Sequence, residues 1–500
     1  MGRDETLTHP HSANNLRNIF KRIENNHYLP SGTAGHGFNG YFDTISNNGT
    51  IWEHTPGTVA IFESMVSALG GNPADAISLA TRDINNASPN RDSTPGLYGL
   101  PIHANEIWRR FSARDLVLST LAATKPNGSP KYRLTLKTHA LVSKVLFDKR
   151  PGKKPRATGV EYLEGQSLYS ADPRHDPSTA TPPTRIAKAR KEVILSAGVF
   201  NSPQLLQLSG VGPRAELARL NIPLVADVPG VGTHMTDNQE LPIVGLAQQP
   251  FTTLPYPDDP PTGCFFGAPG DPCVDLWLQG KGPYARASLN TNAFTLKTTY
   301  STDGDVDILF FAIPFAFRGY WRFDAVVNFP ADPPTTFGLS MVKINPKNRA
   351  GTVKLRSRNP RDTPDINFNI FQEGAAVDLG ALSEGVAWGR SVYRNVSAPY
   401  GPMLPTEPVC GASTAAGCVD SDKQWIREQA FGHHATGTCA IGSSGDRYAV
   451  LDSKFRVRGV DGLRVVDGSA FPRAPGAFPV VSTFLISEKA SEDVLRDARR

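Results

Sequence analysis

The chain has 500 residues, of which 39% are hydrophobic and 20% are charged, a composition typical of a globular protein with more than one domain. Its formal net charge is +5, and the basic residues are scattered, so the sequence gives no indication of nucleic-acid binding. No run of about eighteen apolar residues occurs, and we therefore expect no membrane-spanning helix.

Four of the five cysteines form two close pairs around short loops, Cys264 with Cys273 and Cys410 with Cys418. Neither pair has a further Cys or His at zinc-like spacing, which favours two local disulfides and no metal site. Asn-x-Ser/Thr sequons, the acceptors of N-glycosylation, lie at Asn48, Asn86, Asn127 and Asn395. Together these features favour the secretory pathway, with a cytoplasmic protein carrying free thiols as the alternative.

Apolar residues at helical spacing predict helices within residues 11–30, 57–70 and 109–121. The Gly-rich residues 31–40 lack the Gly-x-Gly-x-x-Gly pattern and follow no strand, which predicts a loop rather than a phosphate-binding turn. Apolar and polar residues then alternate, which predicts strands at residues 132–138, 140–147 and 157–162. A surface loop is predicted to follow at 165–185.

Residues 192–198 predict a buried strand that ends in small residues. The next residues, Asn201-Ser202-Pro203, predict a helix that is capped by Ser202 and has proline in its first turn. Short apolar runs broken by Pro and Gly predict antiparallel strands in 250–330, as does alternation in 339–370, and helical spacing returns at 371–397.

Two long motifs resemble the glucose–methanol–choline (GMC) oxidoreductases. Residues 196–213, beginning Ser-Ala-Gly-Val-Phe-Asn-Ser-Pro-Gln, are similar to one family signature. Residues 432–439, Gly-His-His-Ala-Thr-Gly-Thr-Cys, with residues 459–469 after them, are similar to its C-terminal signature. The opening Ser-Gly-Thr-Ala-Gly-His-Gly-Phe and the ending Pro-Gly-Ala-Phe-Pro resemble the fungal secondary-metabolite branch of the family.

The resemblance implies an α/β fold in which an FAD-binding domain is interleaved with an antiparallel-sheet substrate domain. On this basis we divide the chain into four segments. Residues 1–130 contribute to both domains, 131–235 belong to the FAD-binding domain, 236–420 form the substrate domain, and 421–500 return to the FAD-binding domain with the active-site histidine.

FAD is the cofactor that the resemblance implies, and it also implies which residues contact it. The family's strand on the adenine side of the flavin matches residues 138–145, with Val142 as the contact. Small residues at a strand end let the cofactor approach closely, which is the role implied for Ala197 and Gly198. The residues implied to lie beside the isoalloxazine ring are Asp467, Gly468, Pro479 and Val480.

His434 is the histidine that matches the family's proton acceptor, and an imidazole suits this role because it is neutral and basic near pH 7. The family's second His or Asn falls on Phe478, which can neither donate nor accept a hydrogen bond. Removal of one oriented donor commonly costs a factor of about 10² to 10³ in rate. Asn238 also stands where the family usually has His.

Residues 11–45 resemble the part of the family that follows its Gly-x-Gly-x-x-Gly segment, so we expect the chain to lack that first dinucleotide-binding segment. The leading hypothesis is an FAD-dependent enzyme that oxidises a CH–OH group of a small aromatic or secondary metabolite, with hydride transfer to flavin. A redox-neutral cyclase of the versicolorin B synthase kind is the first alternative, and a truncated homologue that does not retain FAD is the second. The expected partner is a small-molecule substrate, with a homodimer left open.

Overall fold

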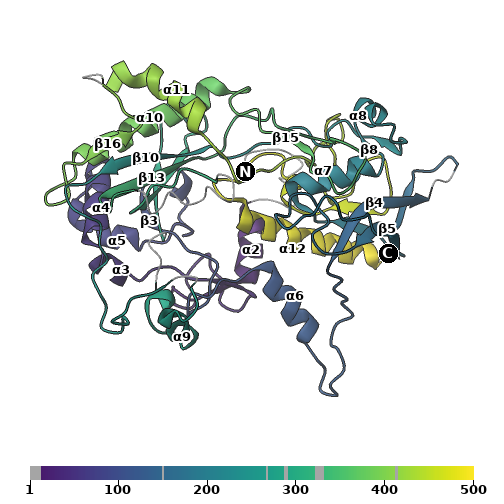
Figure 1. Ribbon diagram of the computed structural model, residues 1–500, viewed down its shortest axis with the longest axis horizontal. Coiled ribbons are helices and arrows are strands. Elements are labelled where there is room, and N and C mark those ends of the chain that lie inside the picture. The colour runs from purple at the N-terminus through teal and green to yellow at the C-terminus, as the bar shows by residue number, and fades with distance from the viewer. Residues whose placement is uncertain are drawn as a thin grey trace.

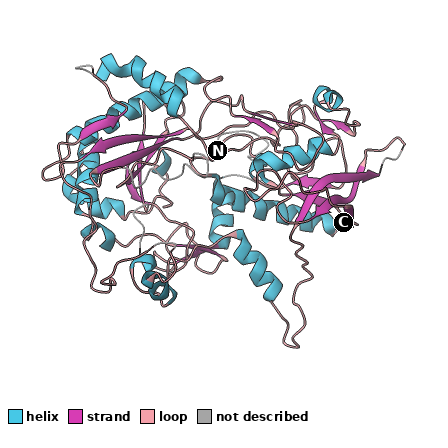
Figure 2. Ribbon diagram, viewed as in Figure 1, coloured by secondary structure: helices cyan, strands magenta, loops and turns pink. Residues whose placement is uncertain are grey.

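The computed structural model describes residues 13–148, 151–265, 268–286, 291–320, 332–411 and 415–499. It has two halves side by side, one built on a six-stranded sheet and the other on shorter strands packed with helices (Figure 1). Helices and strands are intermixed in both halves (Figure 2), which confirms the predicted α/β fold.

The six-stranded sheet is antiparallel throughout, and its strands come from distant parts of the chain. In spatial order they are β16 (Leu404–Glu407), β10 (Glu240–Leu246), β13 (Thr336–Lys343), β12 (Ile308–Ile313), β11 (Asn292–Leu296) and β3 (Gly96–Gly99). Strands β10 and β13 are buried along nearly their whole length, so both faces of the sheet are covered.

Alternate residues of β12 point to opposite faces of the sheet, because side chains alternate along a strand. Ile308 and Phe310 join the largest apolar core together with helices α4 (Pro56–Ala68) and α10 (Ala375–Arg394). Leu309 and Phe311 lie in a second, smaller cluster that includes Phe478. The second face of the sheet therefore looks toward the C-terminal residues that carry the predicted site.

The other half has its own apolar core, formed around the parallel pair β7 (Val193–Leu195) and β17 (Leu463–Val465). Helix α7 (Gly198–Leu208) follows β7 directly. An antiparallel sheet, β4 (Ala140–Asp148), β5 (Arg156–Glu164) and β6 (Thr184–Lys188), packs alongside α7 and β7. The C-terminal helix α12 (Pro479–Ala498) contributes Ala490 to the same core.

Helix α2 (Ala13–Ile23), the first described element, packs against α12, nearly the whole sequence away. Ile19, Phe20 and Ile23 form a small core with Leu485 of α12. Polar contacts reinforce this packing, since the Arg22 guanidinium lies 3.1 Å from Glu488 and 2.8 Å from Glu492, and the Tyr41 hydroxyl donates to Glu488 at 2.7 Å.

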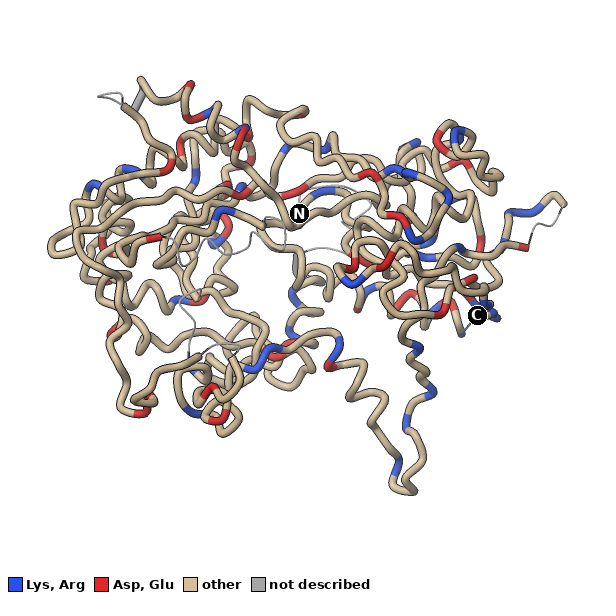
Figure 3. The backbone as a smooth tube through the Cα atoms, in the orientation of Figure 1, with Lys and Arg blue, Asp and Glu red and all other residues tan. Residues whose placement is uncertain are grey.

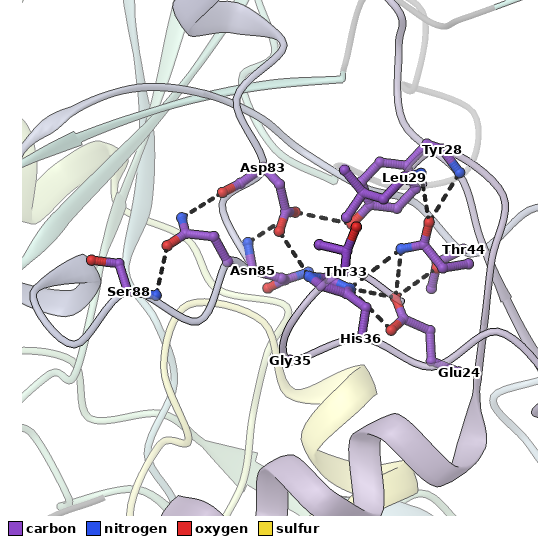
Figure 4. A network of polar contacts seen from close by, with 12 residues as sticks. Glu24, Tyr28, Leu29, Thr33, Gly35, His36, Thr44, Asp83, Asn85 and Ser88 are labelled. Carbon is purple, nitrogen blue, oxygen red and sulfur yellow. Dashed lines mark hydrogen bonds and ion pairs between the residues drawn. The ribbon is translucent and has the colours of Figure 1, made fainter. Parts of the chain in front are cut away.

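A buried polar network ties strand β1 (Glu24–Asn26), which pairs in parallel with β2 (Phe42–Thr44), to the loop at Asp83 (Figure 4). The fully buried His36 ring is its centre, with Nδ1 3.0 Å from Glu24 and Nε2 3.0 Å from Asp83. Burial by itself lowers the pKa of His36, but the hydrogen bonds to Asp83 and Glu24 outweigh it and raise the pKa to about 9.

The predicted helices are confirmed as α2, α4, α10 and α6 (Ala113–Ala122), with bounds that shift by a few residues. The predicted strand at 132–138 is wrong: these residues are exposed and pair with no other strand among the described residues. In residues 250–320, outside the gaps, the predicted antiparallel strands are present as β11 and β12, and the short helix α9 (Pro272–Leu278) precedes them.

The remaining described helices and strands are short, apart from α11 with 11 residues. They are α3 (Thr50–Glu53), α5 (Ala76–Ala80), α8 (Arg214–Arg219), α11 (Val419–Gln429), β8 (Val211–Gly212), β9 (Ala226–Asp227), β14 (Thr352–Lys354) and β15 (Asp365–Asn367). The 3₁₀ turns are Pro73–Asp75, Arg91–Ser93, Pro283–Ala285, Ala415–Cys418 and Gly468–Ala470.

Both predicted disulfides, Cys264–Cys273 and Cys410–Cys418, are formed, and Cys439 is buried as a free thiol. Charges of both signs are interspersed along the tube (Figure 3), as expected from the scattered basic residues. None of the helices in the described ranges combines the length and the apolar character that a membrane crossing requires.

Candidate active site

The predicted catalytic histidine lies where residues 431–436 run antiparallel to residues 236–240. Thr236 pairs with Thr436 and Glu240 pairs with Phe431, each through two backbone hydrogen bonds of 2.8–3.1 Å. Between these bridges, residues 432–435 face only residues 237–239, so one segment carries an extra residue and bulges. The bulge presents His433 and His434.

Asp237 holds this bulge in place. Its Oδ1 accepts the backbone N–H of His434 at 2.8 Å. A Cβ on Gly432 would lie 2.4 Å from Asp237 Oδ2, so only glycine fits beside the carboxyl group. Burial raises the pKa of Asp237 to about 7, although the hydrogen bond from the His434 backbone acts in the opposite direction.

The His434 ring is partly buried between two other rings. The edge of Phe478 meets it at a centroid distance of 4.9 Å and an interplanar angle of 76°, and the His433 ring lies 3.9 Å away. Nδ1 of His434 is buried and has no hydrogen-bond partner among the described residues. Burial, with a smaller contribution from His433, lowers the pKa of His434 to about 3, so this imidazole is neutral near pH 7.

His433 connects the bulge to the six-stranded sheet. Its Nδ1 lies 3.4 Å from Oε2 of Glu240, the first residue of β10. Glu240 is 3% exposed, and its other oxygen, Oε1, accepts the Ser340 hydroxyl of β13 at 2.6 Å. Burial raises the pKa of Glu240 to about 7 and lowers the pKa of His433. The rings of Tyr320 and Phe431 border His433 on its outer side.

Phe478 immediately precedes the first residue of α12, and its ring lies against the second face of the sheet. The Phe311 ring of β12 is 5.3 Å away, centroid to centroid. Asn238 fixes the approach to this helix, because its amide donates to the backbone oxygens of Lys343 and Gly476 at 2.8 and 2.9 Å. Phe478 thus forms an apolar wall opposite His434.

Asp467 joins the ends of the two parallel strands. Its carboxylate accepts the backbone N–H of Gly198 at 3.0 Å, the Ser202 hydroxyl at 2.5 Å and the backbone N–H of Ser469 at 2.8 Å. Gly198 has a φ of +86°, and nothing within 4 Å would meet a Cβ there. The backbone N–H of Gly437 donates to Gly468 at 3.2 Å, which links this strand-end turn to the histidine bulge.

The predicted cap at Ser202 is wrong, because α7 begins at Gly198 and places Ser202 and Pro203 inside the helix. The tertiary bond to Asp467 takes the serine hydroxyl away from the capping role. Pro203 has no N–H to donate to the Val199 carbonyl one turn earlier. The Thr438 hydroxyl donates to that oxygen instead, at 2.6 Å. Thr438 of the C-terminal motif therefore satisfies the carbonyl that Pro203 leaves without a donor.

The other residues predicted to contact FAD lie around this centre. Val142 is on β4 and packs against the same core as β7 and β17. Ala197 is the residue before α7, and its N–H donates to Ser202 at 3.1 Å. Pro479 and Val480 open α12, and Val480 is 47% exposed.

Buried side-chain polar atoms without a partner in the described residues gather at this site. Such atoms are costly unless a water or ligand satisfies them. They include Thr236 Oγ1, Asp237 Oδ2, Asn238 Oδ1, Gln239 Oε1, Glu240 Oε2, His434 Nδ1, Thr436 Oγ1 and Ser469 Oγ. Together with the open space above Gly198, they fit the ring end of a flavin and a polar substrate group.

Asp237, Gly432, Glu240 and Thr438 are site residues that were not predicted from the sequence. Gly432 and Thr438 lie inside the motif of residues 432–439, and Asp237 directly precedes Asn238, so the positions of these three residues carried a usable signal. The position of Glu240 carried no such signal in the sequence, because its proximity to His433 depends on a pairing between segments about two hundred residues apart.

Two models of GMC oxidoreductases match the chain, one over residues 122–240 and the other over residues 346–487. The "Oxygen-dependent choline dehydrogenase" of Pseudomonas fluorescens strain Pf-5 is 32% identical over 385 residues, which cover 75% of this chain and 59% of that protein. A "Glucose methanol choline oxidoreductase" of Aspergillus terreus is 30% identical over 72% of this chain and 55% of its own. The chain thus spans less than two thirds of the length of these relatives.

Solved structures show the same fold at low sequence identity. A variant of the formate oxidase of Aspergillus oryzae matches with a TM-score of 0.72 at 19% identity, over 97% of this chain and 78% of that chain. A fungal aryl-alcohol oxidase matches with a TM-score of 0.65 at 17% identity, over 99% of this chain and 81% of that chain. From its matching segments and its fold, the chain belongs to the GMC oxidoreductase family, whose cofactor is FAD.

Proposed function

We propose that this protein is an FAD-dependent enzyme that oxidises a CH–OH group of a small aromatic or secondary metabolite, with His434 as the proton acceptor. The supporting observation is the buried Nδ1 of His434, which lacks a partner in the described residues, in a ring that faces Phe478 at 4.9 Å. FAD, when bound, supplies the two-electron acceptor.

His434 is held in position before any substrate arrives. The Asp237 carboxyl group anchors its backbone at 2.8 Å, and the ring is confined between His433 and Phe478. A proton taken from a substrate hydroxyl would make the imidazole cationic in a buried site. Two carboxyl groups are placed to stabilise that charge. Asp237 accepts the backbone N–H of His434, and Glu240 lies beside the ring of the neighbouring His433.

The Phe478 ring favours a substrate with an aromatic or apolar part. With Phe311 behind it, this ring presents an apolar surface on which a second ring can pack edge to face or with an offset. We propose that residues 131–235 and 421–500 face the flavin, that residues 236–420 face the substrate, and that residues 1–130 contribute to both parts.

A redox-neutral cyclase is the second candidate, and one observation favours it. Phe478 occupies the place where a second hydrogen-bonding side chain would hold an alcohol for oxidation. A cyclisation needs His434 only to move a proton, and an aromatic wall suits a substrate that must fold on itself. This candidate matches the proposed membership of the fungal secondary-metabolite branch.

Anaerobic mixing tests the proposal. The purified protein is supplied with FAD, separated from free flavin and mixed with a panel of aryl and alkyl alcohols while flavin absorbance is followed. Bleaching with formation of an aldehyde or ketone is the expected result. An isomeric product without bleaching would support the cyclase, and a protein that retains no flavin would contradict both enzymatic functions.

The His434→Gln variant removes the basic nitrogen and should lower the rate of bleaching by about 10² or more. His175→Gln is the matched control, because the hydrogen bond that the described part of the chain gives the His175 ring goes to the backbone oxygen of Ser167 on a surface loop. Equal bleaching rates in the wild type and His434→Gln would refute the role of His434.

We also propose that the protein matures in the secretory pathway. Both cysteine pairs are joined, and three of the four sequon asparagines, Asn48, Asn127 and Asn395, are exposed. Asn86 is half-buried, and its amide donates to the backbone oxygen of Asp83 at 2.6 Å, which makes it a poorer acceptor. Mass spectrometry of the secreted protein before and after glycosidase treatment should find glycans on the exposed three, and unmodified peptides at all of them would contradict this localisation.

A further inference from the structure

His433, His434 and Glu240 bring three potential metal ligands together at the end of strand β10. Each offers one nitrogen or oxygen, and these atoms all lie within 4.8 Å of one another. A second group, formed by Cys264, Asp271 and Cys273, has a similar spacing. Its sulfurs are joined in a disulfide, so of these two groups among the described residues the histidine group is the one available to a metal.

The two carboxylate oxygens of Glu240 have different surroundings. The carboxyl group is 3% exposed, and Oε1 is held by the Ser340 hydroxyl at 2.6 Å. Oε2 is buried, has no hydrogen-bond partner in the described part of the chain, and lies 3.4 Å from His433 Nδ1. Such an oxygen remains costly until a cation or a donor satisfies it.

The spacing suits a small divalent ion. Zinc binds imidazole nitrogen and carboxylate oxygen at about 2.0–2.2 Å, which places tetrahedral ligands about 3.4 Å apart. The 3.4 Å between His433 Nδ1 and Glu240 Oε2 already has this value. Two imidazoles and one carboxylate are a ligand set that zinc uses where it keeps an open fourth position.

Residues that would hold the metal ligands in position are also present. A ligating carboxylate is normally held by a hydrogen bond to its second oxygen, as Ser340 holds Glu240. The backbone of His434 is fixed by Asp237 at 2.8 Å. Within the described ranges, Glu240 forms no ion pair with Lys or Arg, so no protein cation competes for it.

We propose that His433, His434 and Glu240 form a binding site for one zinc ion, with water at the fourth position. The site needs no flavin and no substrate. Zinc would occupy the ring of His434 and therefore inhibit turnover reversibly. That consequence, unlike the site itself, rests on the proposed function.

Metal titration tests the site directly. The metal-free, non-reduced protein is titrated with Zn²⁺ against a chromophoric chelator, without FAD. One Zn²⁺ per chain is the expected stoichiometry. Glu240→Gln and His433→Gln should each weaken the affinity by at least about tenfold, the smaller end of the losses seen even for residues that only support a ligand. His27→Gln is the control, because His27 also lies 2.7 Å from a carboxylate, that of Asp43, but outside this cluster.

Cobalt gives a measurement that needs no variant. Co²⁺ bound to the wild-type chain should show the intense visible absorption of a tetrahedral site, and Zn²⁺ should displace it. The weak spectrum of the hydrated ion at saturating protein would overturn the proposal. So would zinc binding that the Glu240 and His433 variants share in full with the wild type. Failed flavin bleaching, by contrast, would contradict the proposed function and leave the zinc result unchanged.

Discussion

The buried histidine at the centre of the N-terminal network makes the stability of this protein depend on pH in a predictable direction. His36 lies between Glu24 and Asp83, 3.0 Å from each, with no exposed surface on its side chain. Tyr28 donates to Asp83, and Thr44 donates to Glu24, so both carboxylates also have neutral donors. The charged imidazolium is the cation that directly joins the two acids.

The magnitude follows from the shift in pKa. The pKa of His36 rises from 6.5 to about 9, and each unit corresponds to about 1.4 kcal/mol, so the network contributes about 3 kcal/mol when the ring is protonated. Because the folded-state pKa is raised, this stability is fully present below about pH 6.5. It is lost as the pH rises toward about 9.

Urea unfolding followed by tryptophan fluorescence, at a series of pH values from about 6 to 10, measures this dependence. The His36→Gln variant keeps a side chain of similar size but cannot carry a charge. It should be less stable than the wild type at pH 6 by about 3 kcal/mol or more, since it leaves buried carboxylates without their cation. The difference between the two proteins should shrink as the pH approaches 9. A difference that stays constant across this range would refute the reasoning.

Three further changes test contacts at the site. Thr438→Val leaves the Val199 oxygen without its 2.6 Å donor and should lower the free energy of unfolding by about 1–3 kcal/mol in calorimetry, while Thr120→Val on α6 should change it less. Gly432→Ala places a methyl group 2.4 Å from Asp237 and should reduce turnover by about 10² without loss of fold, whereas Gly445→Ala, which meets nothing within 4 Å, should be neutral. Asn238→Ala removes two hydrogen bonds that hold the approach to Phe478 and should raise KM more than it lowers kcat in steady-state assays; an unchanged KM would contradict this role.

Sequence patterns predicted the parts of this fold that depend on local order. The strand predicted within residues 192–198 and the helical spacing of residues 57–70 both follow from apolar periodicity. Both are present, the strand as the shorter β7 (Val193–Leu195). Residues 132–138 alternate like a strand, but alternation creates a strand only where another strand offers an edge, and none does so in the described ranges. Ser202 has the right identity for a cap, yet Asp467, distant in sequence, binds its hydroxyl.

The candidate site also has features that the sequence predicts and features that depend on tertiary packing. His434 and Phe478 lie in recognisable motifs, so their positions could be predicted without a structure. Their mutual distance of 4.9 Å could not, because it depends on how α12 docks against the sheet. Glu240 looks like an ordinary polar residue at the start of a strand. Its place beside His433 arises only when the two segments pair.

Helix α12 connects the packing contact with α2 to Phe478, the residue that we propose borders the substrate. It has 20 residues and is therefore about 30 Å long. Phe478 stands at its leading end, while Leu485, Glu488 and Glu492 are clamped by α2 and its flanking residues. Substitutions that repack Ile19 or Phe20 are expected to shift α12 and, with it, Phe478. The buried contact between α2 and α12 thus gives a way to alter the proposed substrate site from residues outside it.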